Sequence, residues 1–164
     1  MNNKERAILV AERVHSAQVY DIYPYTYHVK QVTKIAEELG YDESIIVASI
    51  LHDTLEDTAL SYNDLKQAFG VEVAEIVYAV TDEIGRNRIE RKSKTYPKIR
   101  SNWKATVVKI CDRIANMEHS KIYNPKLFEM YKKEHEDFCK NLMSPDHPHN
   151  ETNKAWERLN KLLA

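Results

Sequence analysis

Apolar residues recur at intervals of three and four along most of this chain, the spacing typical of amphipathic helices. No segment shows a defensible strand pattern, so we expect no sheet. The chain is therefore predicted to fold as one all-α domain, a helical bundle over residues 1–164. About eight helices are expected, over residues 3–19, 29–39, 43–57, 62–69, 71–80, 105–117, 125–142 and 155–163.

Local signals support several of these helix boundaries. Gly40 and Gly70 stand where helices should end, because glycine readily adopts the left-handed conformation of a C-terminal cap. Asp42 can cap the helix that follows it. Ser61 and Asp64 are spaced as a capping box, with Asp in place of the usual Glu or Gln. The Tyr-rich segment 20–27, which contains a proline, is expected to form a bend.

Composition and charge narrow the class of protein. The 164 residues are 43% hydrophobic and 30% charged, which is typical of a globular chain, and the net charge is -1. So small a charge favours neither nucleic acid nor an anionic membrane as a partner. No apolar run has the length of a signal peptide or a membrane span, which predicts a cytoplasmic protein. Cys111 and Cys139 lack zinc-site spacing; two thiols are favoured over one disulfide. The sequence carries no signal for an oligomeric state.

The segment 50–58 concentrates ionisable side chains behind an apolar run. If the helix is continuous, about 100° per residue places His52, Asp53, Glu56 and Asp57 on one arc of roughly 140°. Burying such groups costs several kcal/mol each unless a cation or hydrogen-bond donors meet them. A divalent metal would meet them. The alternative is a helix end in water with its acids solvated.

Two further polar residues stand in apolar surroundings. His28 follows the tyrosine-rich bend, and Asp112 lies inside the apolar helix 105–117. Two imidazoles and two carboxylates can hold Mn²⁺, Fe²⁺ or Zn²⁺ and leave positions for water. Taken singly, His28 could instead pack among tyrosines, and Asp112 could accept from Arg113 or a cap. The remaining histidines are expected to be surface residues: His15, His119, His135, His147 and His149.

Residues 81–100 form a basic segment with few large apolar side chains. One interpretation is a lid that offers cations to an anionic substrate, because Arg and Lys form charge-assisted bonds with phosphate. The other is a solvated connector or surface helix. The cations are Arg86, Arg88, Arg91, Lys92, Lys94, Lys98 and Arg100.

The ordered pattern His28, His52–Asp53, Asp112 resembles that of the HD-domain phosphohydrolases. The runs SILHDTLEDT (49–58), FG (69–70), VTDE (80–83) and KICDRIANM (109–117) are similar to the hydrolase domain of RelA/SpoT-type proteins, and most similar to stand-alone small alarmone hydrolases. The similarity covers about residues 5–120. Residues 121–164 lie outside those motifs and are expected to add C-terminal helices.

The resemblance implies an enzyme that removes the 3′-diphosphate from guanosine tetra- or pentaphosphate, usually with Mn²⁺. Carried over by motif, the ligands would be His28, His52, Asp53 and Asp112. Glu56 and Asp57 would handle the attacking water and nearby protons. Asn116 and Arg113 would contact sugar or phosphate.

One departure from the family concerns the grip on the nucleotide. The basic pair that usually follows the first helix is absent at Val19–Tyr20. Tyr20, Tyr23 or Tyr25 could stack a base instead, and we expect Arg91 and Lys92 to contact the substrate. The departure keeps two alternatives open. One is a nucleotidase or pyrophosphatase acting on another phosphorylated metabolite. The other is a non-catalytic nucleotide-sensing module, against which the acidic pair argues.

Overall fold

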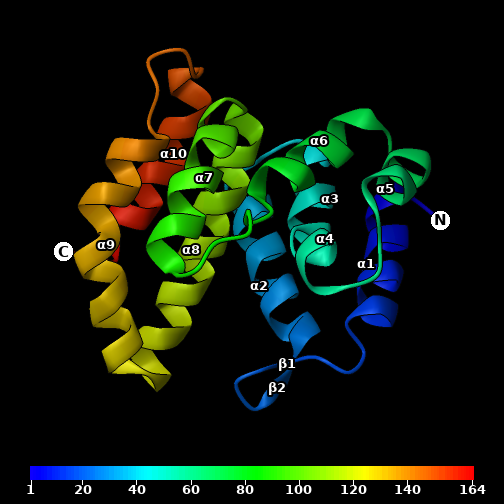
Figure 1. Cartoon of the computed structure of the whole chain (residues 1–164), viewed down its shortest axis with the longest axis horizontal. Helices are drawn as coiled ribbons and strands as arrows, with labels where there is room; N and C mark the ends of the chain where they lie inside the picture. Colours follow the sequence, from blue (N-terminus) through cyan, green and yellow to red (C-terminus); the bar gives the residue numbers. More distant parts are fainter.

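The computed structural model describes all 164 residues and consists of helices joined by short loops (Figure 1). The only strands form a hairpin of two residues each, β1 (Val19–Tyr20) and β2 (Tyr23–Pro24). The all-α, single-domain prediction is confirmed. The helices are α1 (Asn3–Val14), α2 (Tyr25–Glu38), α3 (Glu43–Leu51), α4 (Thr54–Asp57), α5 (Tyr62–Phe69), α6 (Val71–Val80), α7 (Arg88–Arg100), α8 (Trp103–Tyr123), α9 (Pro125–Leu142) and α10 (His149–Lys161). None of them has the length and apolar character that crossing a bilayer requires.

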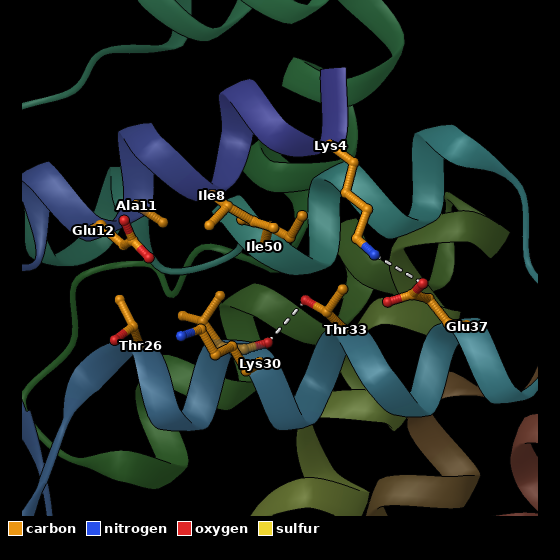
Figure 2. A pocket seen from close by; sticks show the side chains of 10 residues that line it. Lys4, Ile8, Ala11, Glu12, Thr26, Lys30, Thr33, Glu37 and Ile50 are labelled. Atoms are coloured by element: carbon orange, nitrogen blue, oxygen red, sulfur yellow. Dashed lines mark hydrogen bonds and ion pairs between the residues drawn. The ribbon is translucent and has the colours of Figure 1, made fainter. Parts of the chain in front are cut away.

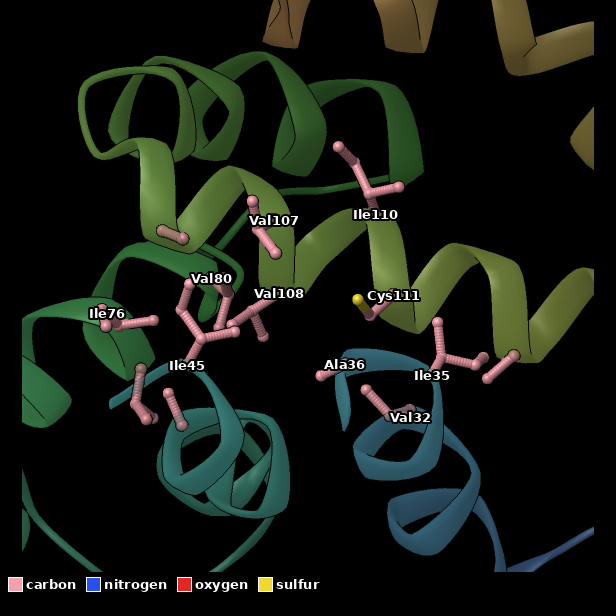
Figure 3. Close-up of a cluster of buried hydrophobic side chains, with 14 of the residues drawn as sticks. Val32, Ile35, Ala36, Ile45, Ile76, Val80, Val107, Val108, Ile110 and Cys111 are labelled. Atoms are coloured by element: carbon pink, nitrogen blue, oxygen red, sulfur yellow. The ribbon is translucent and has the colours of Figure 1, made fainter. Parts of the chain in front are cut away.

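Helix α8 is the centre of the bundle. It packs against α2, α3, α6, α7, α9 and α10. Val107, Val108 and Cys111 of α8 face apolar side chains of α2, α3 and α6, among them Val32 and Ile45 (Figure 3). Most of its residues are buried because neighbours cover it on several sides, which explains why its sequence is apolar over so many positions.

The C-terminal helices belong to the same core. Phe138 and Leu142 of α9, with Trp156 and Leu159 of α10, are almost fully buried within one cluster of 36 hydrophobic residues. The rings of Phe138 and Trp156 meet edge to face, with centroids 5.9 Å apart. Residues 121–164 therefore cover one side of α8 rather than lying apart from the domain.

The capping signals in the sequence are confirmed. The Asp42 side chain accepts from the Ile45 N–H, and Ser61 and Asp64 form a complete capping box. Gly40 and Gly70 have φ values of 77° and 94°, which other residues rarely adopt. Both cysteines are free thiols, as favoured from the sequence.

Several predicted boundaries are wrong. The helix expected over 105–117 continues to Tyr123 as α8, and the last helix begins at His149 instead of 155. Helix α1 ends at Val14 instead of 19, because the chain turns at His15 and the Gln18 N–H bonds to the His15 carbonyl. The expected bend over 20–27 contains the hairpin, and α2 already begins at Tyr25. Proline suits the position before a helix because it has no N–H to satisfy. The helix expected over 43–57 is divided into α3 and α4.

Candidate active site

The division between α3 and α4 falls at His52 and Asp53. Residues 52 and 53 form a turn, and the Thr54 hydroxyl donates to the Leu51 carbonyl at 2.7 Å. Neighbours on a continuous helix diverge by about 100°, so adjacent side chains would point apart. The turn instead brings His52 Nε2 within 3.1 Å of an Asp53 carboxylate oxygen.

Side chains from two distant segments converge on this turn. Nε2 of His28, on α2, lies 2.8 Å from Oδ1 of Asp112, on α8. The same oxygen lies 3.4 Å from Nε2 of His52. His28, His52 and Asp112 are all buried. The structure thus brings together the four residues predicted as metal ligands.

The protonation of His52 decides whether a cation fits here. Its Nδ1 lies 2.7 Å from the Ser49 carbonyl oxygen, which can only accept, so Nδ1 carries the proton. In the neutral ring, Nε2 then has a lone pair that faces the Asp53 and Asp112 carboxylates, and this buried nitrogen has no hydrogen-bond partner. A lone pair facing two carboxylates is unfavourable unless a cation lies between them. Two imidazoles and two carboxylates fit a divalent transition metal.

The ionisation of the two buried acids differs. Burial raises the pKa of Asp53 well above its ordinary value, and the negative charges of Asp112, Glu56 and Asp57 act in the same direction. Burial would also raise the pKa of Asp112. The hydrogen bond from His28 and the positive charge of Lys109 outweigh that effect and hold the pKa of Asp112 well below its usual range. The local excess of acid is what a bound cation would neutralise.

Glu56 and Asp57 lie on α4 beside Asp53, with carboxylate oxygens of all three within 4.8 Å of one another. The Asp82 N–H donates to Glu56 Oε1 at 2.9 Å, and Gln18 Nε2 donates to Asp57 Oδ2 at 3.2 Å. Burial of its carboxyl group raises the pKa of Glu56. Both acids are thus held in place by groups outside their own helix.

A polar cavity of about 100 Å³ opens beside this centre. Acidic side chains, including Glu56, line part of this cavity. Two lysines, Lys92 and Lys109, add positive charge to its lining. Lys92 donates to both carboxylate oxygens of Asp82, at 2.9 and 3.0 Å, and burial lowers its pKa to about 8. The cavity is lined by His52, Asp53, Glu56, Val80, Asp82, Lys92, Val108, Lys109 and Asp112.

Lys109 and Asp82 were not singled out from the sequence. Lys109 Nζ lies 3.5 Å from Asp112 Oδ2, three residues along α8. A lysine on the buried stripe of an apolar helix, one turn before a buried acid, was the available signal. Asp82 lies in the run VTDE (80–83), but its role could not be assigned from it, because its contacts with Glu56 and Lys92 join different segments of the chain.

The predicted substrate contacts fall into two groups. Lys92 lines the cavity, whereas Arg91, its neighbour on α7, does not. Tyr25 is buried against His15, at 4.6 Å between ring centroids. Arg113 is buried beside the Tyr131 and Phe138 rings and lies 3.4 Å from a Glu134 carboxylate oxygen. Neither Tyr25 nor Arg113 reaches the cavity wall.

Asn116 is engaged by protein at both ends of its amide. Its Oδ1 accepts from the Tyr20 hydroxyl at 2.8 Å, and its Nδ2 donates to Asp112 Oδ1 at 3.2 Å. Tyr20 itself stacks on His28, and Tyr23 stacks on Tyr27. These rings, which the sequence suggested for a base, each have one face covered by protein.

Two histidines predicted at the surface are buried. His15 Nδ1 lies 2.7 Å from Gln18 Oε1, and His119 Nε2 lies 3.1 Å from Asp21 Oδ2. Sequence spacing could not reveal this, because the tyrosine-rich hairpin that covers His119 joins the helix only in three dimensions.

The basic segment forms α7, and several of its cations pair with protein acids, such as Arg88 with Glu134.

A family model described as "HD domain" matches residues 7–138. The chain belongs to the HD domain family. This HD domain is 32% identical over 105 residues to the Drosophila melanogaster protein named guanosine-3′,5′-bis(diphosphate) 3′-pyrophosphohydrolase MESH1, covering 62% of this chain and 59% of that protein. It is 33% identical over 120 residues to an Aquifex aeolicus protein named guanosine-3′,5′-bis(diphosphate) 3′-pyrophosphohydrolase, covering 70% of this chain and 17% of that one. The chain thus spans less than two thirds of either relative.

Two solved structures share the fold. One, titled "A metazoan ortholog of SpoT hydrolyzes ppGpp and plays a role in starvation responses", has a TM-score of 0.77 at 24% identity, covering 98% of this HD domain and 96% of that chain. The other, a Listeria monocytogenes protein, has a TM-score of 0.67 at 24% identity, covering 86% and 98%. At 24% identity, both comparisons show only that the fold is shared.

Proposed function

We propose that this HD domain is a metal-dependent phosphohydrolase that removes diphosphate from the 3′ position of guanosine tetra- or pentaphosphate. One observation carries the proposal: the buried Nε2 of His52, which has no hydrogen-bond partner, faces two carboxylates beside a second buried imidazole. The names of the Drosophila melanogaster and Aquifex aeolicus relatives support this reaction and this substrate.

His28, His52, Asp53 and Asp112 would hold the ion, for which we propose Mn²⁺, with Fe²⁺ or Zn²⁺ as alternatives. A divalent ion so bound supplies a water of lowered pKa and Lewis acidity toward phosphoryl oxygen. The chain's own groups do the rest. Glu56, held by the Asp82 N–H, accepts the proton of the attacking water. Asp57, held by Gln18, lies within reach of the same proton.

The cationic part of the cavity suits a phosphorylated substrate. Lys92 and Lys109 are largely buried and line the same small cavity as Glu56. Ammonium groups in such a place form charge-assisted bonds with phosphate oxygens. The net charge of -1 supports a small nucleotide as partner rather than a nucleic acid. Contacts of Arg91, Arg113, Tyr25 and Asn116 with substrate stay predictions.

One observation favours a second candidate substrate. The hairpin offers no cation at Val19–Tyr20, and the rings of Tyr20 and Tyr23 each have a covered face. A phosphorylated metabolite that is bound without contacts from a cation or an aromatic ring at this hairpin could be hydrolysed by the same metal centre. A nucleotidase or pyrophosphatase is therefore the second candidate.

A substrate panel with product analysis tests the proposal. Purified protein, stripped of metal and reloaded with Mn²⁺, is incubated with ppGpp, deoxynucleoside monophosphates and NADPH. We expect release of diphosphate from ppGpp, dependent on Mn²⁺ and abolished by chelation. Monophosphate release from another compound would favour the second candidate. Protein that binds no divalent ion and hydrolyses nothing would contradict both.

A further inference from the structure

The β1–β2 hairpin joins the two helices that carry His28 and Asp112. It leads directly into α2, and its turn residue Asp21 has a φ of 56°, in the left-handed region rare for residues other than glycine. Asp21 Oδ2 lies 3.1 Å from Nε2 of His119 on α8. The hairpin is therefore attached to α2 by the chain and to α8 by side chains, which places Tyr20 of β1 between the two.

The ring of Tyr20 lies against one ligand-bearing histidine. It stacks on His28 with centroids 4.6 Å apart and planes inclined by 13°. Because an imidazole nitrogen has its lone pair in the ring plane, a neighbour that fixes the plane also fixes where Nε2 points. That nitrogen lies 2.8 Å from Asp112. Its other nitrogen, Nδ1, is buried without a hydrogen-bond partner, so stacking replaces the hydrogen bond that usually orients such a ring.

The hydroxyl of Tyr20 acts on Asp112 through Asn116. It donates to Asn116 Oδ1 at 2.8 Å, which leaves Asn116 Nδ2 to donate to Asp112 Oδ1 at 3.2 Å. An amide accepts at one end and donates at the other. The Asp112 carboxylate only accepts, so the Nδ2 end of Asn116 faces it, and the Tyr20 hydroxyl holds the amide in that position by donating to the Oδ1 end. Without that donor the amide loses its anchor at Oδ1 and is free to swing away from Asp112.

The attachment to α8 continues beyond Asn116. His119 is three residues further along the same helix face and meets the Tyr20 ring edge-on at 5.0 Å. His119 is buried, and the rings of Tyr23, Tyr27 and Tyr123 also surround it. The position of Tyr20 is thus fixed from several sides, as a positioning role requires.

We infer that Tyr20 is a positioning residue of the metal centre, which holds His28 by stacking and Asp112 through Asn116. The inference rests on the proposed function, since it takes His28 and Asp112 as ligands. It also implies that the Tyr20 ring stacks on His28 of the protein and not on a nucleobase of the substrate.

Metal affinity of single variants provides the test. Mn²⁺ is titrated into metal-stripped protein by calorimetry for the wild type, Tyr20→Phe and Tyr20→Leu. Phe keeps the stack and loses the hydroxyl, whereas Leu loses both. We expect the Kd for Mn²⁺ to rise about 10-fold for Tyr20→Phe and up to about 100-fold for Tyr20→Leu. Tyr62→Phe, which loses a hydroxyl bond to Glu75 between α5 and α6, is the matched control and should bind as wild type.

A double-mutant cycle separates this role from a general effect on folding. If Tyr20 acts on Asp112 through Asn116, adding Tyr20→Phe to Asn116→Leu should cost no further affinity. Thermal unfolding without metal shows whether each variant folds. If Tyr20→Leu does not fold, the Mn²⁺ affinity of Tyr20→Phe alone decides the test. Wild-type Mn²⁺ affinity in folded Tyr20→Phe and Tyr20→Leu would overturn the inference and leave the proposed function intact. Wild-type protein that binds no Mn²⁺ would contradict both the inference and the proposed function.

Discussion

The Ser49 carbonyl accepts a hydrogen bond from His52 Nδ1 at 2.7 Å, in the last turn of α3. Because α3 ends at Leu51, its last carbonyl groups have no partner within the helix. The end of the helix therefore supplies the acceptor that fixes the His52 tautomer. The orientation of this imidazole is determined by the backbone.

Replacing His52 should remove the ion. His52→Gln keeps a polar side chain but loses the lone pair that faces Asp53 and Asp112. We expect the metal content of the purified protein to fall at least ~10-fold by elemental analysis. His149→Gln, at an exposed position at the start of α10, is the control and should keep its metal. Equal metal content in both variants would exclude His52 as a ligand.

Replacing Glu56 should stop turnover without loss of metal. Gln cannot accept the proton of the attacking water, and loss of a general base lowers kcat by roughly 10²–10⁴-fold. The measurement is kcat on the best substrate of the panel, with metal content determined on the same sample. Glu157→Gln, an exposed acid on α10, is the matched control. A metal-loaded Glu56→Gln variant with wild-type kcat would remove Glu56 as the base.

Lys92 should contribute to substrate binding through its charge. Lys92→Met is expected to raise KM roughly 10- to 100-fold, corresponding to the loss of a charge-assisted contact of about 1.5–3 kcal/mol. Lys92→Arg keeps the charge and should lose less. Lys94→Met removes an exposed cation on the same helix that pairs with Glu90, and serves as control. If Lys94→Met raised KM as much as Lys92→Met, general electrostatics rather than a contact in the cavity would be responsible.

The ion pair between α7 and α9 should make stability depend on pH. Arg88 donates to both Glu134 oxygens, at 2.7 and 3.0 Å. Burial would raise the pKa of Glu134, but the bonds from Arg88 and the charge of Arg113 lower it. A carboxyl with a lower pKa when folded stabilises the fold above its unfolded pKa, and this stabilisation disappears as pH falls through the folded pKa.

Glu134→Gln should therefore be less stable than wild type at pH 7 by about 1 kcal/mol, a modest value because both side chains are partly exposed. The difference should shrink as pH falls below about 4.3, the ordinary value for Glu. Urea unfolding of both proteins at several pH values measures it. Glu129→Gln, an exposed acid on the same helix, should show no such dependence. A difference that grows on acidification would contradict the assignment.

The helices could be predicted because their apolar spacing and caps are local. Ser61 with Asp64 and the two glycines identified ends that the structure reproduces. The division between α3 and α4 at His52–Asp53 could not be predicted, because the sequence there has a pattern typical of a continuous helix. Its cause is tertiary: His52 lies 3.4 Å from Asp112, 60 residues away in sequence, and Asp53 lines the same cavity as Asp112.

Within the candidate site, the residue types were visible but several partners were not. A buried acid such as Asp112 in an apolar helix can be recognised from the sequence. The use of Asp82 to hold both Glu56 and Lys92 depends on three segments meeting, and no local pattern encodes it. The same holds for Tyr20, whose ring and hydroxyl contact two different helices.

A second, less polar cavity of about 220 Å³ separates α1 from α2, with Ile50 among its lining residues and the Lys4–Glu37 ion pair at one end (Figure 2). It shows how unevenly the bundle is filled: the side of α8 covered by α9 and α10 is packed by Phe138, Leu142, Trp156 and Leu159. Shortening the chain before Pro125 would therefore strip the central helix of an apolar cover and leave a surface prone to aggregation. The last forty residues cannot be treated as a removable appendage when fragments of this protein are expressed.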